Sequence, residues 1–201
     1  MSYMFSGAGY SASTFVLDLS SWKTSEVTNM RSMFSSAGHE STSFVLKLSS
    51  WDTSKVENMM SMFEYFGFSA SDFSLDLSFL NTSNVQNMSY MFNYAGFNSS
   101  NFVLNLSSWD TSNVTSMYSV FSSAGYSATS FTINLSSWNT SNVTGMSSMF
   151  SYAGRSASTW SVIIPQTNGN GISNTADRIY GKTSSIFDGP AYGKSFTLVQ
   201  L

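Results

Sequence analysis

The chain has 201 residues and a net charge of -3, with only 9% charged residues and no cysteine. It has neither the basic face that holds a phosphate backbone nor a long apolar run, so we expect no nucleic-acid partner and no membrane insertion. The length suits one domain with a substantial core, and the absence of cysteine does not decide the compartment.

A spacing of 29 residues recurs along the chain as far as Gly154, without insertion or deletion. Three sets of residues keep this spacing: Phe5, Phe34, Phe63, Phe92, Phe121 and Phe150; Trp22, Trp51, Trp109 and Trp138, with Leu80 in the third place; and Gly9, Gly38, Gly67, Gly96, Gly125 and Gly154. A fixed period of this length is typical of a solenoid, in which each unit is buried by its neighbours.

The first residue falls inside a repeat, because Met1 shares a column with Met30, Met59 and Met88. One interpretation is that the chain is a segment of a longer protein, with upstream repeats and an export signal outside this sequence. The other is a natural start that leaves an open solenoid end. No basic residue or apolar stretch follows Met1, so we expect no signal peptide in the sequence itself.

Each unit opens with an alternating pattern. Phe15, Leu17 and Leu19 alternate with polar or β-branched residues, which predicts a short strand with one buried face. The same pattern returns at Phe44, Phe73, Phe102 and Phe131.

The second half of each unit has a different spacing. Val27, Met30, Met33 and Phe34 lie three or four residues apart, which predicts a helix with one apolar face. Thr24–Ser25 suits the helix N-cap, and the glycine at 38 suits its end.

Strands and helices in alternation predict an α/β solenoid of 29-residue strand-helix repeats, right-handed and leucine-rich-repeat-like, with parallel strands. Because helices pack further apart than strands, we expect the stack to curve with its strands on the concave side. The repeats should fill residues 1–164, as five full repeats with partial ends. Pro165 should end the strand ladder, and residues 165–201 should form a β-rich C-terminal cap.

Little in the sequence suits catalysis, and we expect neither an enzyme nor a cofactor. The only histidine, His39, occupies a repeat position that elsewhere holds Tyr, Phe or Arg. The methionine columns suit core packing better than a metal site, and the tryptophan column suits the core or a corner. Acidic side chains alternate with Lys and Asn in their columns, which favours helix caps or Asx turns over calcium ligation.

Two surfaces are candidate binding sites. The first is an aromatic loop edge, whose residues either bind sugars or a protein partner or staple neighbouring loops together. Its residues are Tyr10, His39, Phe68, Phe97 and Tyr126, with Tyr65, Tyr94 and Tyr152 nearby. The second is the outward face of the strands, expected to be concave, with Asp18, Lys47, Asp76, Asn105 and Asn134.

The segments LSSWKTSEVTNM, LSSWDTSKVENM, LSFLNTSNVQNM, LSSWDTSNVTSM and LSSWNTSNVTGM resemble the repeat of the BspA-like bacterial surface-protein family. The resemblance covers about 1–154 and departs from the family in the longer loop after the glycine and in Leu80. It implies a surface-exposed, leucine-rich-repeat-like protein that adheres to or binds a partner, without naming the ligand.

We therefore expect a non-enzymatic adhesin or receptor-binding segment on an extracellular, cell or virion surface. Its partner would be a surface protein or glycan of a host or neighbouring cell. An alternative is a structural element that self-associates through the open N-terminal repeat edge, end to end, in a filament or virion spike. A third hypothesis, ice binding, rests on the Ser/Thr ladders.

Overall fold

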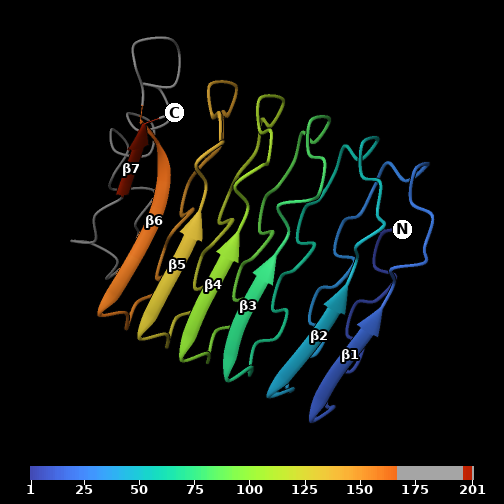
Figure 1. Cartoon of the computed structure of the whole chain (residues 1–201), viewed down its shortest axis with the longest axis vertical. Coiled ribbons are helices and arrows are strands. Elements are labelled where there is room, and N and C mark those ends of the chain that lie inside the picture. The colour runs from blue at the N-terminus through green and yellow to red at the C-terminus, as the bar shows by residue number, and fades with distance from the viewer. Residues whose placement is uncertain (167–196, 201) are drawn as a thin grey trace.

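The computed structural model describes residues 1–166 and 197–200 and shows a stack of parallel strands (Figure 1). The strands follow one another in chain order along one side of the stack. They are β1 (Thr14–Asp18), β2 (Ser43–Lys47), β3 (Asp72–Asp76), β4 (Asn101–Asn105), β5 (Ser130–Asn134), β6 (Thr159–Gln166) and β7 (Thr197–Gln200). The predicted strands are confirmed in each repeat.

The repeat sets the strand register. Phe15 pairs with Phe44 in the β1–β2 sheet, and Phe73, Phe102 and Phe131 pair across β3, β4 and β5. Equivalent residues of neighbouring repeats therefore lie side by side. The chain forms a parallel β-solenoid, and we call each of its turns a rung.

The predicted helix is wrong, because the segment from Thr24 to Gly38 is a chain of tight turns. Met33 N donates to Met30 O at 3.2 Å, whereas Met30 N donates to Asn58 O of the next rung at 2.9 Å. Successive turns reverse direction at non-glycine residues with positive φ, which no α-helix contains. These residues are Tyr3, Ser32, Ser36, Ser61, Tyr65, Tyr90, Tyr94, Ser119, Ser123, Ser148 and Tyr152.

Thr24 consequently has another role than the predicted N-cap. Its hydroxyl donates to Asp52 O of the next rung at 2.9 Å, and the side chain is buried. Thr53, Thr82 and Thr111 make the same bond to the rung that follows them, at 2.8 to 2.9 Å. These threonines therefore join neighbouring rungs, whereas a helix N-cap would form hydrogen bonds only within its own segment.

The α/β assignment is therefore replaced by a β-solenoid with no helix in the described residues. The apolar spacing of three and four misled the helix prediction because the turns point the same residues inward. Met30, Met33 and Phe34 are fully buried in the core. The right-handed connection and the boundary at residue 164 stay predictions.

The expected curvature depended on the helices and does not follow from the observed structure. On the strand side the Phe73 and Phe102 ring centroids lie 4.7 Å apart, and on the turn side those of His39 and Phe68 lie 4.6 Å apart. Both sides stack at the strand spacing of about 4.8 Å, so nothing forces the strand face to be concave.

Trp51, Trp109 and Trp138 belong to the core, and two of them also join rungs. Trp109 is fully buried, and its Nε1 donates at 2.8 Å to the carbonyl oxygen of Leu77, which directly follows β3 in the preceding rung. Trp51 Nε1 donates to Leu19 O in the same way at 3.1 Å. This confirms the sequence prediction of a core or corner position.

One rung departs from the pattern and coincides with a break in the sheet. Neighbouring strands are paired except β2 and β3, whose carboxyl ends lie visibly further apart in Figure 1. Phe66 stands where the other rungs have alanine, with its ring 4.8 Å from that of Phe44. The Phe44 and Phe73 rings are tilted by 53°, whereas those of Phe73 and Phe102 are stacked at 7°. We attribute the break to this extra ring.

The predicted end of the ladder at Pro165 is also wrong. β6 continues through Pro165, which pairs with Val199 of β7. The pairing of β6 with β5 ends at Ile163, so the missing proline N–H removes no bond to β5. β7 adds a strand beyond β6, and the rest of the predicted cap, 167–196 and 201, lies outside the described residues.

The turn conformation can be tested at Ser119, whose φ is 51°. Glycine adopts this conformation without strain, so Ser119→Gly should be more stable than Ser119→Ala by about 1–2 kcal/mol. In a helix the order would reverse, with alanine better by about 1 kcal/mol. Urea unfolding measures the difference. Ser122, which does not have a positive φ, is the control, and an alanine preference at both positions would contradict the turn.

Candidate functional site

The predicted aromatic edge forms one continuous stack, which we call the aromatic row: Tyr10, His39, Phe68, Phe97, Tyr126 and Arg155. Neighbouring ring centroids from Tyr10 to Tyr126 lie 4.5 to 4.8 Å apart, with planes within 11° of parallel. The Arg155 guanidinium lies over the Tyr126 ring, 5.2 Å from its centroid. The rungs thus bring together residues that are far apart in the sequence.

Backbone geometry places this row. Each member follows a glycine with positive φ, and a Cβ on Gly125 would come within 2.8 Å of the Phe102 side chain. The glycine allows the chain to turn closely over the core and directs the next residue to the side of the solenoid. Ser69 N donates to His39 O at 2.9 Å, so backbone bonds hold the rings at rung spacing.

A second set of tyrosines packs beside the aromatic row. Tyr65 and Tyr94 stack at 4.8 Å, and Tyr94 also lies 5.6 Å from Phe97. Burial is the main cause that raises the pKa of Tyr65, with Tyr94 and Glu64 adding to it. Tyr152 is more exposed and lies 6.4 Å from Tyr126.

The sequence left two alternatives for these rings: they bind a partner, or they staple neighbouring loops together. The rings staple neighbouring loops, because they stack on each other face to face. Their outward edges stay accessible, since His39, Phe68, Phe97 and Tyr126 are half-buried rather than buried. A ligand would therefore contact ring edges along the row, and sugar stacking between the rings is excluded. Binding at this edge stays a prediction.

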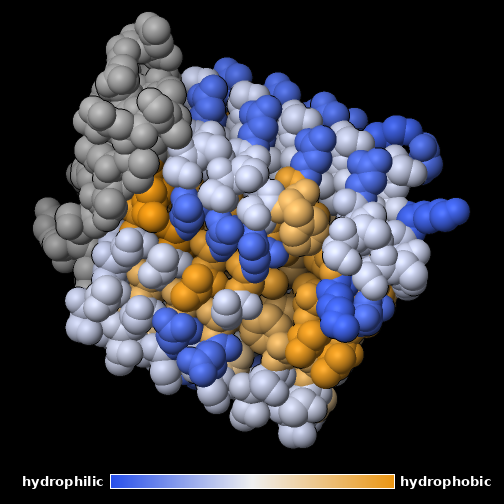
Figure 2. Space-filling model, in the orientation of Figure 1, coloured by the Kyte–Doolittle hydropathy of each residue, from blue (hydrophilic) through white to orange (hydrophobic). Residues whose placement is uncertain are grey.

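The strand-face candidates also form a column. Lys47 Nζ lies 3.3 Å from Asp18 Oδ2, and Asn105 Nδ2 donates to Asp76 Oδ1 at 3.1 Å. Asp18 Oδ1 accepts the hydroxyl and the N–H of Ser20, which are the main causes that hold the pKa of Asp18 below its usual value. These contacts confirm Asx turns rather than helix caps. Figure 2 shows this side of the molecule, with polar groups among apolar ones.

His39 has no acid–base partner in the described part of the chain. Its ring lies between Tyr10 and Phe68, and its buried Nδ1 has no hydrogen-bond partner among the described residues. Burial is the main cause that lowers the pKa of His39. Within 1–166 and 197–200 no group of three His, Cys, Asp or Glu residues could hold a metal ion. The same residues contain no helix that could cross a membrane.

Sequence analysis did not identify some of the apolar residues that are exposed in the structure. Phe79 is 48% exposed and stands where other rungs have serine, and Tyr118 is exposed where they have Arg, Met or Ser. Tyr118 lies against Gly145, where a Cβ would come within 2.2 Å of its ring. Phe79 and Tyr118 each differ from the residues at the same position in the other rungs. This difference is the sequence signal that could have identified them as candidate functional residues.

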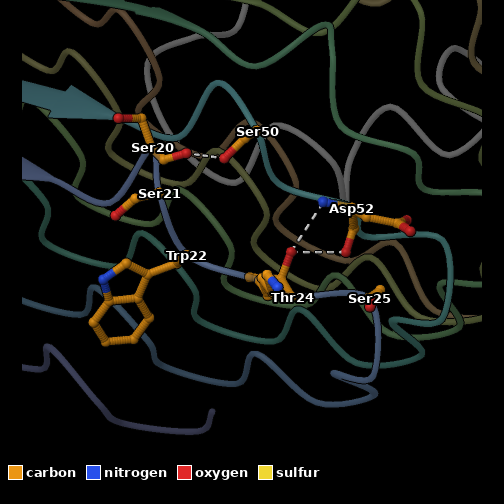
Figure 3. A pocket seen from close by; sticks show the side chains of 8 residues that line it. Ser20, Ser21, Trp22, Thr24, Ser25, Ser50 and Asp52 are labelled. Atoms are coloured by element: carbon orange, nitrogen blue, oxygen red, sulfur yellow. Dashed lines mark hydrogen bonds between the residues drawn. The ribbon is translucent and has the colours of Figure 1, made fainter.

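A hollow of about 430 Å³ lies at the turn after β1 (Figure 3). We call it the Trp22 hollow; its lining residues are Ser20, Ser21, Trp22, Lys23, Thr24, Ser25, Ser50 and Asp52. It combines one large aromatic ring with several hydroxyl groups and two opposite charges. Sequence reasoning missed it, because Trp22 belongs to a column that is otherwise buried.

Three Asx turns predict an acid-sensitive stability. Hydrogen bonds, led by those from Ser20, Ser54 and Ser78, lower the pKa of Asp18, Asp52 and Asp76 respectively. A lowered pKa in the folded state stabilises the fold above the unfolded pKa of about 3.9 and loses that effect as the pH falls through the folded value. Replacing all three by Asn should therefore reduce the loss of thermal stability between about pH 5 and pH 3.

Asparagine already makes this turn in the same columns, at Asn105 and Asn139, so the triple variant should fold normally near pH 7. Thermal unfolding followed by circular dichroism at each pH measures the effect. Equal acid sensitivity of the variant and the parent chain would contradict the role of these carboxylates.

Comparison with known proteins gives one family match. The model of the family described as "Mycoplasma protein of unknown function, DUF285" matches residues 1–123 and 65–163, which together span most of the chain. No curated protein and no solved structure matches. The chain therefore belongs to the DUF285 family of Mycoplasma proteins of unknown function.

Proposed function

We propose that this chain is a non-enzymatic surface protein that binds a glycan or protein of a host or neighbouring cell. The observation that carries the proposal is the aromatic row, which runs from Tyr10 to Arg155 with its edges accessible along the solenoid. Exposed aromatic rings are costly to keep in water and are enriched where proteins meet partners.

The repeat motif supports the cellular setting. LSSWDTSNVTSM and its variants resemble the BspA-like surface repeat, which we take as the finer identity within the DUF285 family. On this proposal the chain acts outside the cell, attached to or released from a cell or virion surface.

The chemistry of the row suits a polar partner surface. Ring edges carry partial positive charge and contact carbonyl and hydroxyl oxygens favourably. Tyr10 and Tyr126 add hydroxyl groups, and Arg155 adds a charged donor beside Tyr126. A glycoprotein or polysaccharide presents such oxygens over a long surface.

Replacing Phe68, Phe97 and Tyr126 together by Leu tests the row. Leucine keeps apolar bulk at these half-buried positions and removes the flat aromatic edges, so binding should weaken by about tenfold or more while the fold survives. Labelled protein is applied to a glycan array and to cultured mammalian epithelial cells, and circular dichroism checks folding.

Phe79→Leu is the matched control, because Phe79 is an exposed phenylalanine that does not belong to the aromatic row. Its binding should equal that of the parent chain. The proposal is overturned if the parent chain binds neither surface, or if the triple variant binds as well as the parent.

A second candidate function is structural, with the N-terminal end of the solenoid stacking on another molecule. Among the described strands, β1 is paired with β2. Met4 is 51% exposed, whereas Met33 and Met62 in the same column are fully buried. An unpaired strand edge and an exposed apolar side chain are features that favour association.

Sedimentation velocity over a concentration series tests this alternative. Self-association should increase with concentration and should be abolished by Met4→Lys, which places a charge in the apolar end. Tyr118→Lys, at an exposed site away from that end, should leave it unchanged. A monomer at every concentration would count against a structural role.

A further inference from the structure

We infer that Arg155, at one end of the aromatic row, binds the carboxylate of an acidic sugar residue in a glycan. The inference rests on the proposed function, because it takes a glycan as the partner of the row. It goes further by naming the chemical class of that glycan and the side chain that binds its charge.

Two tyrosine rings hold the Arg155 guanidinium in place. Its Cζ atom lies 5.2 Å from the centroid of the Tyr126 ring and 5.9 Å from that of Tyr152. Arg155 Nη1 also donates a hydrogen bond to the Tyr126 hydroxyl. The backbone fixes the spacing of the two rungs, since Ser156 N donates to Tyr126 O at 3.1 Å. The cation therefore has a defined position before any ligand binds, which lowers the entropic cost of binding.

The charge of Arg155 is not compensated within the described part of the chain. The ion pairs of the described residues lie in other rungs and involve lysine. Between residues 111 and 166 the sequence has no Asp or Glu, and Arg155 is the only charged residue. This part of the solenoid therefore presents a single positive charge, which favours an anion at that place.

The guanidinium is also accessible and has free donors. Arg155 is exposed, and the Tyr152 side chain beside it is 38% exposed. An arginine has five N–H donors, and the hydrogen bond to the Tyr126 hydroxyl is the one recorded for this side chain among the described residues. The planar group can thus still donate two parallel hydrogen bonds to a carboxylate. A phosphate group fits less well, because it carries up to two charges and meets only one cation here.

The neighbouring groups favour a sugar as the bearer of the carboxylate. Ser127 and Ser156, which follow Tyr126 and Arg155, are exposed and carry hydroxyl groups. Phe97 stacks on Tyr126 at 4.5 Å, so the ring edges of the row continue from the cation along the solenoid. A pyranose can therefore place its carboxylate at Arg155 and its hydroxyl oxygens at the ring edges and serines.

Two acidic probes and one neutral probe test the site on the full chain. The acidic probes are the methyl glycosides of glucuronic acid and N-acetylneuraminic acid. The neutral probe is methyl glucoside, which has the glucuronide ring without the carboxylate. NMR titration follows the side-chain Nε–H resonance of Arg155, assigned by its loss in Arg155→Lys. At least one acidic glycoside should shift this resonance, less strongly at high salt, and methyl glucoside should not. The acidic probe that binds shows whether the carboxylate belongs to a hexuronic or a sialic acid.

Variants separate the charge from the geometry, and saturation-transfer signals of the sugar protons over a concentration series measure their binding. Arg155→Gln should weaken binding by about tenfold or more, because it removes the charge. Arg155→Lys should retain part of it, since lysine keeps the charge but lacks the planar fork. Circular dichroism confirms that each variant is folded.

Arg31→Gln is the matched control. Arg31 is exposed and its guanidinium also lies over a tyrosine ring, 5.8 Å from the centroid of Tyr3, but it does not belong to the aromatic row. This variant should bind the acidic glycoside as the parent chain does.

The site is overturned if neither acidic glycoside shifts the Arg155 resonance, if methyl glucoside shifts it equally, or if Arg155→Gln binds as well as the parent chain. A tetraglutamate peptide that binds at Arg155 more tightly than either glycoside would also overturn it, and would identify an acidic protein segment as the partner.

Failure of this site is distinguishable from failure of the proposed function. If binding to the glycan array or to cells depends on the rings of the row but is unchanged in Arg155→Gln, the proposed function stands and this site does not. If an acidic glycoside binds at Arg155 but the parent chain binds neither the array nor the cells, the site stands and the proposed function does not.

Discussion

Hydrogen bonding between successive rungs at a constant register is the constraint on which the whole structure depends. Strand residues, threonine hydroxyls and alternate N–H groups of the turns all form hydrogen bonds to the neighbouring rung. A single rung has no partner for these groups, and unpaired buried N–H groups are costly. The repeat therefore stabilises itself only as a stack, and its side chains are forced into columns spaced by about 4.8 Å.

The columns explain the unusual composition. Like charges side by side in a column would repel, and between residues 1 and 163 no two neighbouring rungs carry like charges in the same column. Where charges do meet they are opposite, as in Lys47 with Asp18 and Lys55 with Glu26. Ser, Thr and Asn fill the rest, because they can repeat at this spacing. Aromatic rings also repeat well, since flat faces stack at almost the same distance.

Departures from a column distinguish one rung from another in a molecule made of similar units. Phe66, in place of alanine, coincides with the sheet break, and Leu80, in place of tryptophan, lies in the core of the same region. Phe79 and Tyr118 present large apolar groups where other rungs present small or polar ones. A partner that recognises one place on the solenoid has these positions to recognise.

The sequence by itself determined the period, the strands, the parallel register and the aromatic row, because each follows from residue types repeated at a fixed interval. Phe15, Leu17 and Leu19 alternate with the period of a strand that has one buried face. The tertiary structure decided the second half of each repeat. Val27, Met30, Met33 and Phe34 fit a helix or a chain of turns equally well. The choice depends on whether every N–H group bonds within the segment, as in a helix, or whether some bond to the next rung, as those of Met30 and Phe34 do. It also decided how the core is closed, since the stacking of rungs buries Trp109 completely.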